Sequence, residues 1–196
     1  MNVSDSLQIL ILSGSVRRPS HTFALARFVE GALSERGARV VLWDFREAPL
    51  PIADPAYHAD PRRHPDPVVQ RLAETADACD GFIWASPVYH NSYSGVLKNA
   101  LDTLTIPHFS YKPVGLMGHG GDRTTQAVDH LRLIVRGLLG VALTTNVCTT
   151  AEDYQNVGEG YALASEPIKE RVDRFADELV EFAHQFCGFR ESRHRP

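Results

Sequence analysis

The chain has 196 residues, of which 43% are hydrophobic and 22% are charged, and its formal net charge is −4. These values are typical of a globular protein, and we expect a single domain over residues 1–196. Because no basic stripe is present to neutralise a run of phosphates, a nucleic-acid partner is not expected.

The cysteines and the N-terminal segment indicate where the protein works. Cys79, Cys148 and Cys187 lie far apart and form neither a C-x-x-C pair nor a zinc-binding spacing. This pattern fits a reducing cytoplasm, in which each cysteine is a small buried hydrophobe. The first apolar run is only about six residues long and follows no basic segment, which is too short for a signal peptide or a membrane span. We therefore expect a cytoplasmic protein without a membrane partner.

The first 43 residues predict a strand, a helix and a second strand. Leu7–Leu12 is a nearly continuous apolar run, as in a strand buried on both faces of a parallel sheet. Apolar side chains then recur at helical spacing over 22–36, and Gly37 stands where a helix often ends. Arg39–Trp43 is a second apolar run. Together they predict a βαβ unit with a right-handed crossover.

The next segment, Asp44–Pro67, is rich in proline and has little periodicity. It predicts a long irregular loop that is ordered by proline rather than by hydrogen bonds. Loops of this length in compact domains are often functional, but the sequence does not indicate the role of this one.

The rest of the chain continues the alternation of helices and strands. We expect helices over about 66–79, 92–104, 123–139 and 166–186, and strands over 82–85, 114–117 and 141–147. Five strands alternating with five helices predict a doubly wound parallel α/β sheet. In such a sheet, ligands bind beyond the carboxyl ends of the strands, so the loops after the first, third and fourth strands are candidate binding loops.

The first of these loops, residues 14–22, favours an anion. It leads into a helix N-terminus, where free N–H groups and the helix dipole attract negative charge. Ser15, Ser20 and Thr22 add hydroxyl donors, and Arg17 or Arg18 adds a guanidinium suited to phosphate. The alternative is an ordinary Ser/Thr helix cap with surface arginines. The loop lacks both the P-loop and the G-x-G-x-x-G patterns, which argues against ATP or NAD as its resident ligand.

The other two loops suit a flat heterocycle. Residues 86–95 combine a proline, aromatic rings and free amides near a helix start, although a helix cap with aromatic core residues would look the same. Residues 118–122 contain three glycines, which allow close backbone approach and positive φ. A tight turn is the alternative for this third loop.

Two of these motifs resemble the NADPH-dependent FMN reductase family, a flavodoxin-like group. The G-S-x-R-x-x-S motif of the family matches Gly14 to Ser20, and its P-x-Y-x-x-S-x-S-G-x-L-K-N-x-L-D motif matches Pro87 to Asp102. The resemblance covers roughly residues 7–150 and is strongest to the azobenzene-reductase and NAD(P)H:FMN-reductase branch. It implies a five-stranded sheet of order 2-1-3-4-5 with helices on both faces.

The resemblance also implies a binding site for FMN. The residues it assigns to the phosphate are Ser15, Arg17, Ser20 and Thr22. Those it places along the flavin are Pro87, Val88, Tyr89, Asn91, Gly118, Gly120 and Gly121. Many members read P-E-Y-N where this chain has Val88 and His90, so the Glu and Asn contacts of those members do not transfer.

The resemblance implies an oxidoreductase that passes hydride from NADPH or NADH to bound FMN and on to a small-molecule acceptor such as a flavin, a quinone, an azo compound or a metal oxyanion. No side chain is assigned as acid, base, nucleophile or metal ligand. The alternatives are a flavodoxin-like electron carrier, which would not oxidise NADPH steadily, and a flavin-free sensor or scaffold, which would be colourless.

We also expect a homodimer or homotetramer. The apolar side chains of residues 92–104, followed by Ile106, Phe109 and Tyr111, form a wider surface than one domain face would bury. The resemblance points to dimers or dimers of dimers, with a neighbouring subunit near the flavin.

Overall fold

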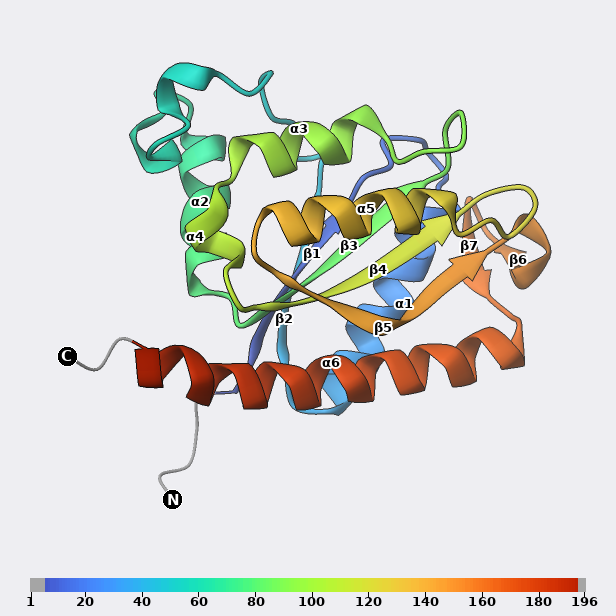
Figure 1. The fold of residues 1–196 in the computed structure, drawn as a ribbon. Helices are drawn as coiled ribbons and strands as arrows, with labels where there is room; N and C mark the ends of the chain where they lie inside the picture. The colour runs from blue at the N-terminus through green and yellow to red at the C-terminus, as the bar shows by residue number, and fades with distance from the viewer. Residues whose placement is uncertain (1–5, 194–196) are drawn as a thin grey trace.

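A five-stranded parallel sheet forms the centre of the protein, which we describe from a computed structural model covering residues 6–193 (Figure 1). Its strands are β1 (Gln8–Ser13), β2 (Arg39–Asp44), β3 (Gly81–Pro87), β4 (Pro113–His119) and β5 (Val141–Thr149). Neighbouring strands are parallel, and their order is β2-β1-β3-β4-β5. This confirms the predicted α/β class and the strand order implied by the resemblance.

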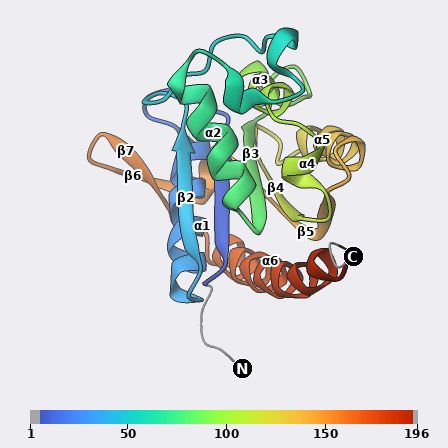
Figure 2. The same cartoon turned by 90° about the vertical axis from the view of Figure 1, so that its left-hand side faces the viewer.

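Helices cover both faces of this sheet, as Figures 1 and 2 show. The helices α1 (His21–Glu35) and α6 (Glu166–Arg193) lie on one face, and α2 (Pro67–Ala78), α3 (Gly95–Thr103) and α5 (Gln126–Gly137) lie on the other. Since successive strand residues point to opposite faces, Ile11 belongs to the core cluster formed with α1 and α6, whereas Leu12 belongs to the cluster formed with α2, α3 and α5. The continuous apolar run of β1 is thus explained by burial on both sides. None of the described helices is long and apolar enough to span a bilayer.

The predicted elements occur within a few residues of their expected bounds, but several short elements were not predicted, among them the 3₁₀ helix η3 (Ala151–Asp153). The helix α4 (Ile106–Phe109) follows α3. The antiparallel strands β6 (Tyr154–Val157) and β7 (Gly160–Leu163) form a hairpin that projects beside α1 (Figure 2). In addition, α6 continues to Arg193, beyond the expected end near residue 186.

The proline-rich segment is ordered by hydrogen bonds, so that part of the prediction is wrong. It contains two short 3₁₀ helices, η1 (Pro55–Tyr57) and η2 (Pro61–Arg63). Asp54, Asp60 and Asp66 each precede a proline and cap η1, η2 and α2 by accepting a backbone N–H two residues on, at 2.8–3.2 Å. Three Asp-Pro pairs therefore start two short 3₁₀ turns and the helix α2.

This segment is also attached to α3 through one side chain. The Asn99 amide donates to the Pro51 carbonyl at 2.8 Å and accepts the Ala53 N–H at 2.9 Å. Both bonds are long-range in sequence, so they fix the start of the segment against the helix.

The apolar surface that we expected to remain on the α3 region is mostly buried within the chain. Leu97, Leu101 and Leu104 lie in the core, and α4 turns Phe109 onto Phe82 and Trp84, with ring centroids 4.7 and 5.4 Å away. The premise that one domain cannot bury these side chains is therefore wrong, because the short helix α4 folds them inward. Ile106 is the main exception, with 45% of its surface exposed.

Candidate functional site

The candidate site lies at the carboxyl edge of the sheet, around β1. Because β2 flanks β1 on one side and β3 on the other, the strand order reverses there, which is where open α/β sheets bind ligands. The loops after β1, β3 and β4 meet at this edge: the Gly14 N–H donates to the Ala85 carbonyl at 2.8 Å, and the Val88 N–H donates to the His119 carbonyl at 2.8 Å.

The loop between β1 and α1 presents a series of unused donors. Among residues 6–193, no acceptor binds the backbone N–H groups of residues 15–18 or 20–22. The Ser13 hydroxyl, at the end of β1, is fully buried and has no hydrogen-bond partner within the described part of the chain. Such a concentration of free donors at a helix N-terminus is suited to an anion.

The predicted phosphate residues are brought together in this loop. Ser15, Ser20 and Thr22 are buried, and the Ser20 hydroxyl donates to the Ser15 hydroxyl at 2.9 Å. Ser20 is also the N-cap of α1, accepting the Phe23 N–H at 3.1 Å, so the helix-cap alternative describes part of its role.

The two arginines of the loop differ. Arg18 forms an ion pair with Glu47, whereas the exposed Arg17 guanidinium has no hydrogen bond or ion pair within residues 6–193. Arg17 is therefore the cation available to a ligand at this loop.

Two serines that the sequence reading did not single out attach the first loop to the second. The Ser94 hydroxyl donates to the Gly14 carbonyl at 2.6 Å and caps α3 by accepting the Leu97 N–H at 3.2 Å. The Ser86 hydroxyl accepts the Ser94 N–H at 2.9 Å. A Cβ on Gly14 would lie 2.7 Å from the Leu97 Cβ, so only glycine allows this approach. The S-x-S-G part of the second motif, which contains Ser94, is the sequence feature that could have indicated this role of Ser94.

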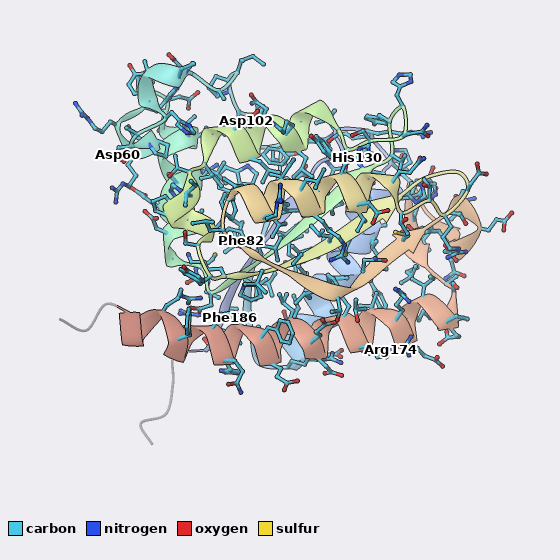
Figure 3. The ribbon with its side chains drawn as sticks, in the orientation of Figure 1. Asp60, Phe82, Asp102, His130, Arg174 and Phe186 are labelled. Atoms are coloured by element: carbon cyan, nitrogen blue, oxygen red, sulfur yellow. The ribbon has the colours of Figure 1, made fainter. Side chains whose placement is uncertain are left out.

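The second loop is a tight turn, and the residues in it that are candidates for contact with the flavin differ in how far they are buried. Pro87 is buried, Val88 is half-buried, and Tyr89 is 49% exposed. Tyr89 and Ser92 exchange backbone hydrogen bonds around His90 and Asn91, which both have positive φ. Asparagine suits that conformation, so the turn alone gives a reason for Asn91. The Ser92 hydroxyl also lies 3.0 Å from the ring of His130 on α5, which Figure 3 labels.

The third loop approaches the second through one glycine. A Cβ on Gly120 would lie 2.8 Å from the Val88 side chain, whereas one on Gly118 would make ordinary contacts and one on Gly121 would meet nothing within 4 Å. Close backbone approach is therefore confirmed at Gly120. None of the three glycines has positive φ, so that expectation is wrong. Arg123, the residue after this loop, adopts positive φ and pairs with the buried Asp153 at 2.9 Å.

A cluster of rings beside the first loop was also missed. His21, the first residue of α1, stacks on Tyr161 and on His119 with ring centroids 3.6 and 4.5 Å apart. Burial, followed by the nearby His21, lowers the pKa of His119 to about 4, so His119 is neutral at pH 7. These rings come from α1, β4 and the hairpin, and nothing in their sequence spacing indicates that they meet.

These features fit FMN. A phosphate would meet the free N–H groups and Arg17 of the first loop, and a flat ring system would lie near the second and third loops. The orphaned Ser13 hydroxyl and the glycine-dependent approach at Gly14 and Gly120 are observations of this structure that favour such an occupant.

Known proteins resemble this chain in sequence over most of its length. The family model for NADPH-dependent FMN reductase matches residues 7–155. The chain is 39% identical over 175 residues to an FMN-dependent NADPH-azoreductase of Staphylococcus saprophyticus, covering 88% of this chain and 93% of the relative. It is 37% identical over 177 residues to the enzyme of that name from Staphylococcus aureus, covering 89% and 94%.

Solved structures share the fold. The flavoenzyme NAD(P)H:(acceptor) oxidoreductase of Paracoccus denitrificans superposes with a TM-score of 0.73 at 20% identity, covering 92% of this chain and 98% of that one. The apo form of an NADH:FMN oxidoreductase gives a TM-score of 0.67 at 20% identity, covering 92% and 90%. By its family match and by the identity and coverage of its relatives, this chain belongs to the NADPH-dependent FMN reductase family.

Proposed function

We propose that this protein is an FMN-dependent NAD(P)H oxidoreductase that reduces a small aromatic acceptor. The observation that carries this proposal is the first loop, where the backbone donors of residues 15–18 and 20–22 and the Arg17 guanidinium have no partner among residues 6–193 and buried serines stand in the same segment. The names of the relatives, which are FMN-dependent NADPH-azoreductases, support the same activity.

When bound, FMN supplies the redox chemistry, taking electrons from the nicotinamide and delivering them to the acceptor. The chain itself holds and orients the cofactor. Ser15, Ser20, Thr22 and Arg17 would bind the phosphate. The residues that would line the ring system are Pro87, Val88, Tyr89, Asn91, Gly118, Gly120 and Gly121.

An apolar hollow next to the phosphate loop favours an aromatic acceptor. Val16 lies on one side of it, Gly95 and Val96 at the start of α3 lie on another, and Phe45 and Leu50 lead into the proline-rich segment. Val16 is 51% exposed and Ile52, at the rim, is 84% exposed. An apolar wall of this kind suits the ring of an azo compound, a quinone or a flavin better than a metal oxyanion. We infer that the proline-rich segment serves as this wall.

The test is anaerobic mixing of the purified, FMN-loaded protein with NADPH and, separately, NADH. The proposal predicts rapid bleaching of the flavin absorbance, followed by recovery when an azo dye or a quinone is added. Steady NADPH oxidation distinguishes this enzyme from an electron carrier. A protein that stays colourless after incubation with FMN, or a bound flavin that neither nucleotide bleaches, would refute the proposal.

We further propose that the protein works in the cytoplasm as one domain that assembles into a homodimer or homotetramer. The exposed apolar side chains of Val16, Ile52 and Tyr89 border the candidate site, and a neighbouring subunit would cover them. Light scattering at micromolar concentration tests the assembly. A mass near the 21.7 kDa of one chain, with full activity retained, would contradict it.

A further inference from the structure

His21 has a fixed ring and no polar partner. Its imidazole lies between Tyr161 of β7 and His119 of β4, with interplanar angles of 20° and 26°, and Tyr154 of β6 packs against it with ring centroids 4.8 Å apart. Within residues 6–193, no hydrogen bond or ion pair engages either of its ring nitrogens. The stack therefore holds an imidazole whose donor capacity is unused.

The neighbours of His21 are themselves held in place. The His119 Nδ1 lies 3.1 Å from the Thr149 hydroxyl, which in turn lies 2.9 Å from the Tyr154 hydroxyl. These bonds connect β4, β5 and β6 around the stack. An imidazole packed against rings in this way has little freedom to rotate.

His21 is the first residue of α1 and directly follows Ser20 of the first loop. Burial, followed by the charge of Arg17, lowers the pKa of His21, and the charge of Arg17 also contributes to the lowered pKa of His119. Such like-charge repulsion requires the groups to be near one another. An anion bound between Arg17 and His21 would replace this repulsion with two attractions, and the seven backbone N–H groups of residues 15–18 and 20–22, which have no acceptor among residues 6–193, belong to the same segment.

We propose that His21 is a further ligand of the FMN phosphate, presented to the phosphate loop by the ring stack that the β6–β7 hairpin completes. This inference rests on the proposed function. It assigns a role to the hairpin, whose Tyr161 supports the face of the imidazole opposite His119. On binding, the imidazole takes up one proton and donates a charge-assisted hydrogen bond to a phosphate oxygen.

The groups that face His21 determine the pH at which its imidazole takes up a proton. They are Arg17 from the loop, His119 from β4, Tyr154 from β6 and Tyr161 from β7. Asp153 acts on His119 but is paired with Arg123. In the free protein His21 is neutral at pH 7.5, and a phosphate dianion raises its pKa, so FMN binding takes up a proton there. The second pKa of the phosphate is about 6, so the phosphate is already a dianion at that pH.

The test compares His21→Phe with the wild type by titrating apo-protein with FMN and with riboflavin, following the quenching of flavin fluorescence. Phenylalanine keeps a ring in the stack but cannot donate. We expect the Kd for FMN to rise about tenfold, the effect of one charge-assisted hydrogen bond, and the Kd for riboflavin to stay unchanged. His184→Phe, which changes an exposed histidine on α6, is the matched control and should alter neither value.

Calorimetry of the wild type provides a second test that needs no variant. Titration of FMN at pH 7.5 in two buffers of different ionisation enthalpy should reveal the uptake of up to one proton, and titration of riboflavin should reveal none. Equal weakening of FMN and riboflavin in His21→Phe, unchanged FMN binding, or the absence of proton uptake would overturn this inference alone. A wild-type protein that fails to bind FMN would overturn the proposed function as well.

Discussion

Replacing Gly14 with alanine should separate the first and second loops of the site. A Cβ at this position would lie 2.7 Å from the Leu97 Cβ, 2.8 Å from the Ser94 Oγ and 3.0 Å from the Ala85 carbonyl oxygen. None of these atoms is the free end of a flexible side chain, so the backbone itself must move. The movement would also strain the 2.6 Å bond from the Ser94 hydroxyl to the Gly14 carbonyl.

The loss of stability in Gly14→Ala can be estimated from the cost of adding a methyl group to a filled interior. Inserting a methyl group into a filled interior costs about 1–3 kcal/mol of unfolding free energy. For a domain of this length, that corresponds to a fall in Tm of roughly 2–12 °C. Because the loop that moves carries the phosphate donors, the Kd for FMN should rise as well.

Thermal unfolding of the apo-protein, followed by circular dichroism, measures the first effect, and FMN titration measures the second. Gly121→Ala is the matched control, since a Cβ there meets nothing within 4 Å and the residue does not have positive φ. Its Tm should equal or slightly exceed that of the wild type. If Gly14→Ala unfolds at the wild-type temperature and binds FMN normally, the close approach that we describe is wrong.

Three other changes test separate parts of the structure. Asn99→Ala removes two hydrogen bonds to the proline-rich segment, so limited proteolysis should cut near residues 50–56 faster than in the wild type; an unchanged cleavage rate would show that the segment is held by other contacts. Ser94→Ala removes a helix cap and a bond to the first loop and should lower the unfolding free energy by about 1–3 kcal/mol in urea titrations, whereas a loss below about 0.5 kcal/mol would contradict its assigned role. His119 has a folded-state pKa of about 4, below its ordinary 6.5, so its contribution to stability is complete above pH 6.5 and is lost as the pH falls towards 4. The wild type should therefore lose on the order of 1–2 kcal/mol more than His119→Phe over that interval, after allowance for partial exposure, and parallel pH profiles would refute this.

The sheet could be predicted from sequence because its physical signals are local. The run Leu7–Leu12 is apolar at every position but Gln8, as burial on both faces requires, and the helical spacing over 22–36 is equally direct. The hairpin was missed because each of its strands has four residues and because its partner is α1, more than a hundred positions away in the chain.

The sequence could predict which candidate residues share one loop, but it could not predict which distant segments meet beside that loop. Ser15, Ser20 and Arg17 are neighbours in sequence, and the free donors around them follow from the helix start. The stack of His21 on His119 and Tyr161 depends on how the hairpin packs, which no spacing encodes. The prediction of an exposed apolar patch was wrong for a related reason. The residues expected to form a loop after α3 instead form the helix α4, which turns Phe109 into the core.

The claim that FMN is held through its phosphate in the first loop is tested most directly by comparing Arg17→Ala with Arg18→Ala. The Arg17 guanidinium has no hydrogen bond or ion pair among residues 6–193, whereas the Arg18 guanidinium is paired with Glu47, so only Arg17 should matter to the phosphate. Titration of each apo-protein with FMN should give a Kd raised roughly tenfold to a hundredfold by Arg17→Ala, the effect of about 1.5–3 kcal/mol, and little changed by Arg18→Ala. Riboflavin should bind the wild type more weakly than FMN does and should respond to neither substitution. Equal losses for FMN and riboflavin in Arg17→Ala, or equal losses of FMN in the two variants, would contradict the account.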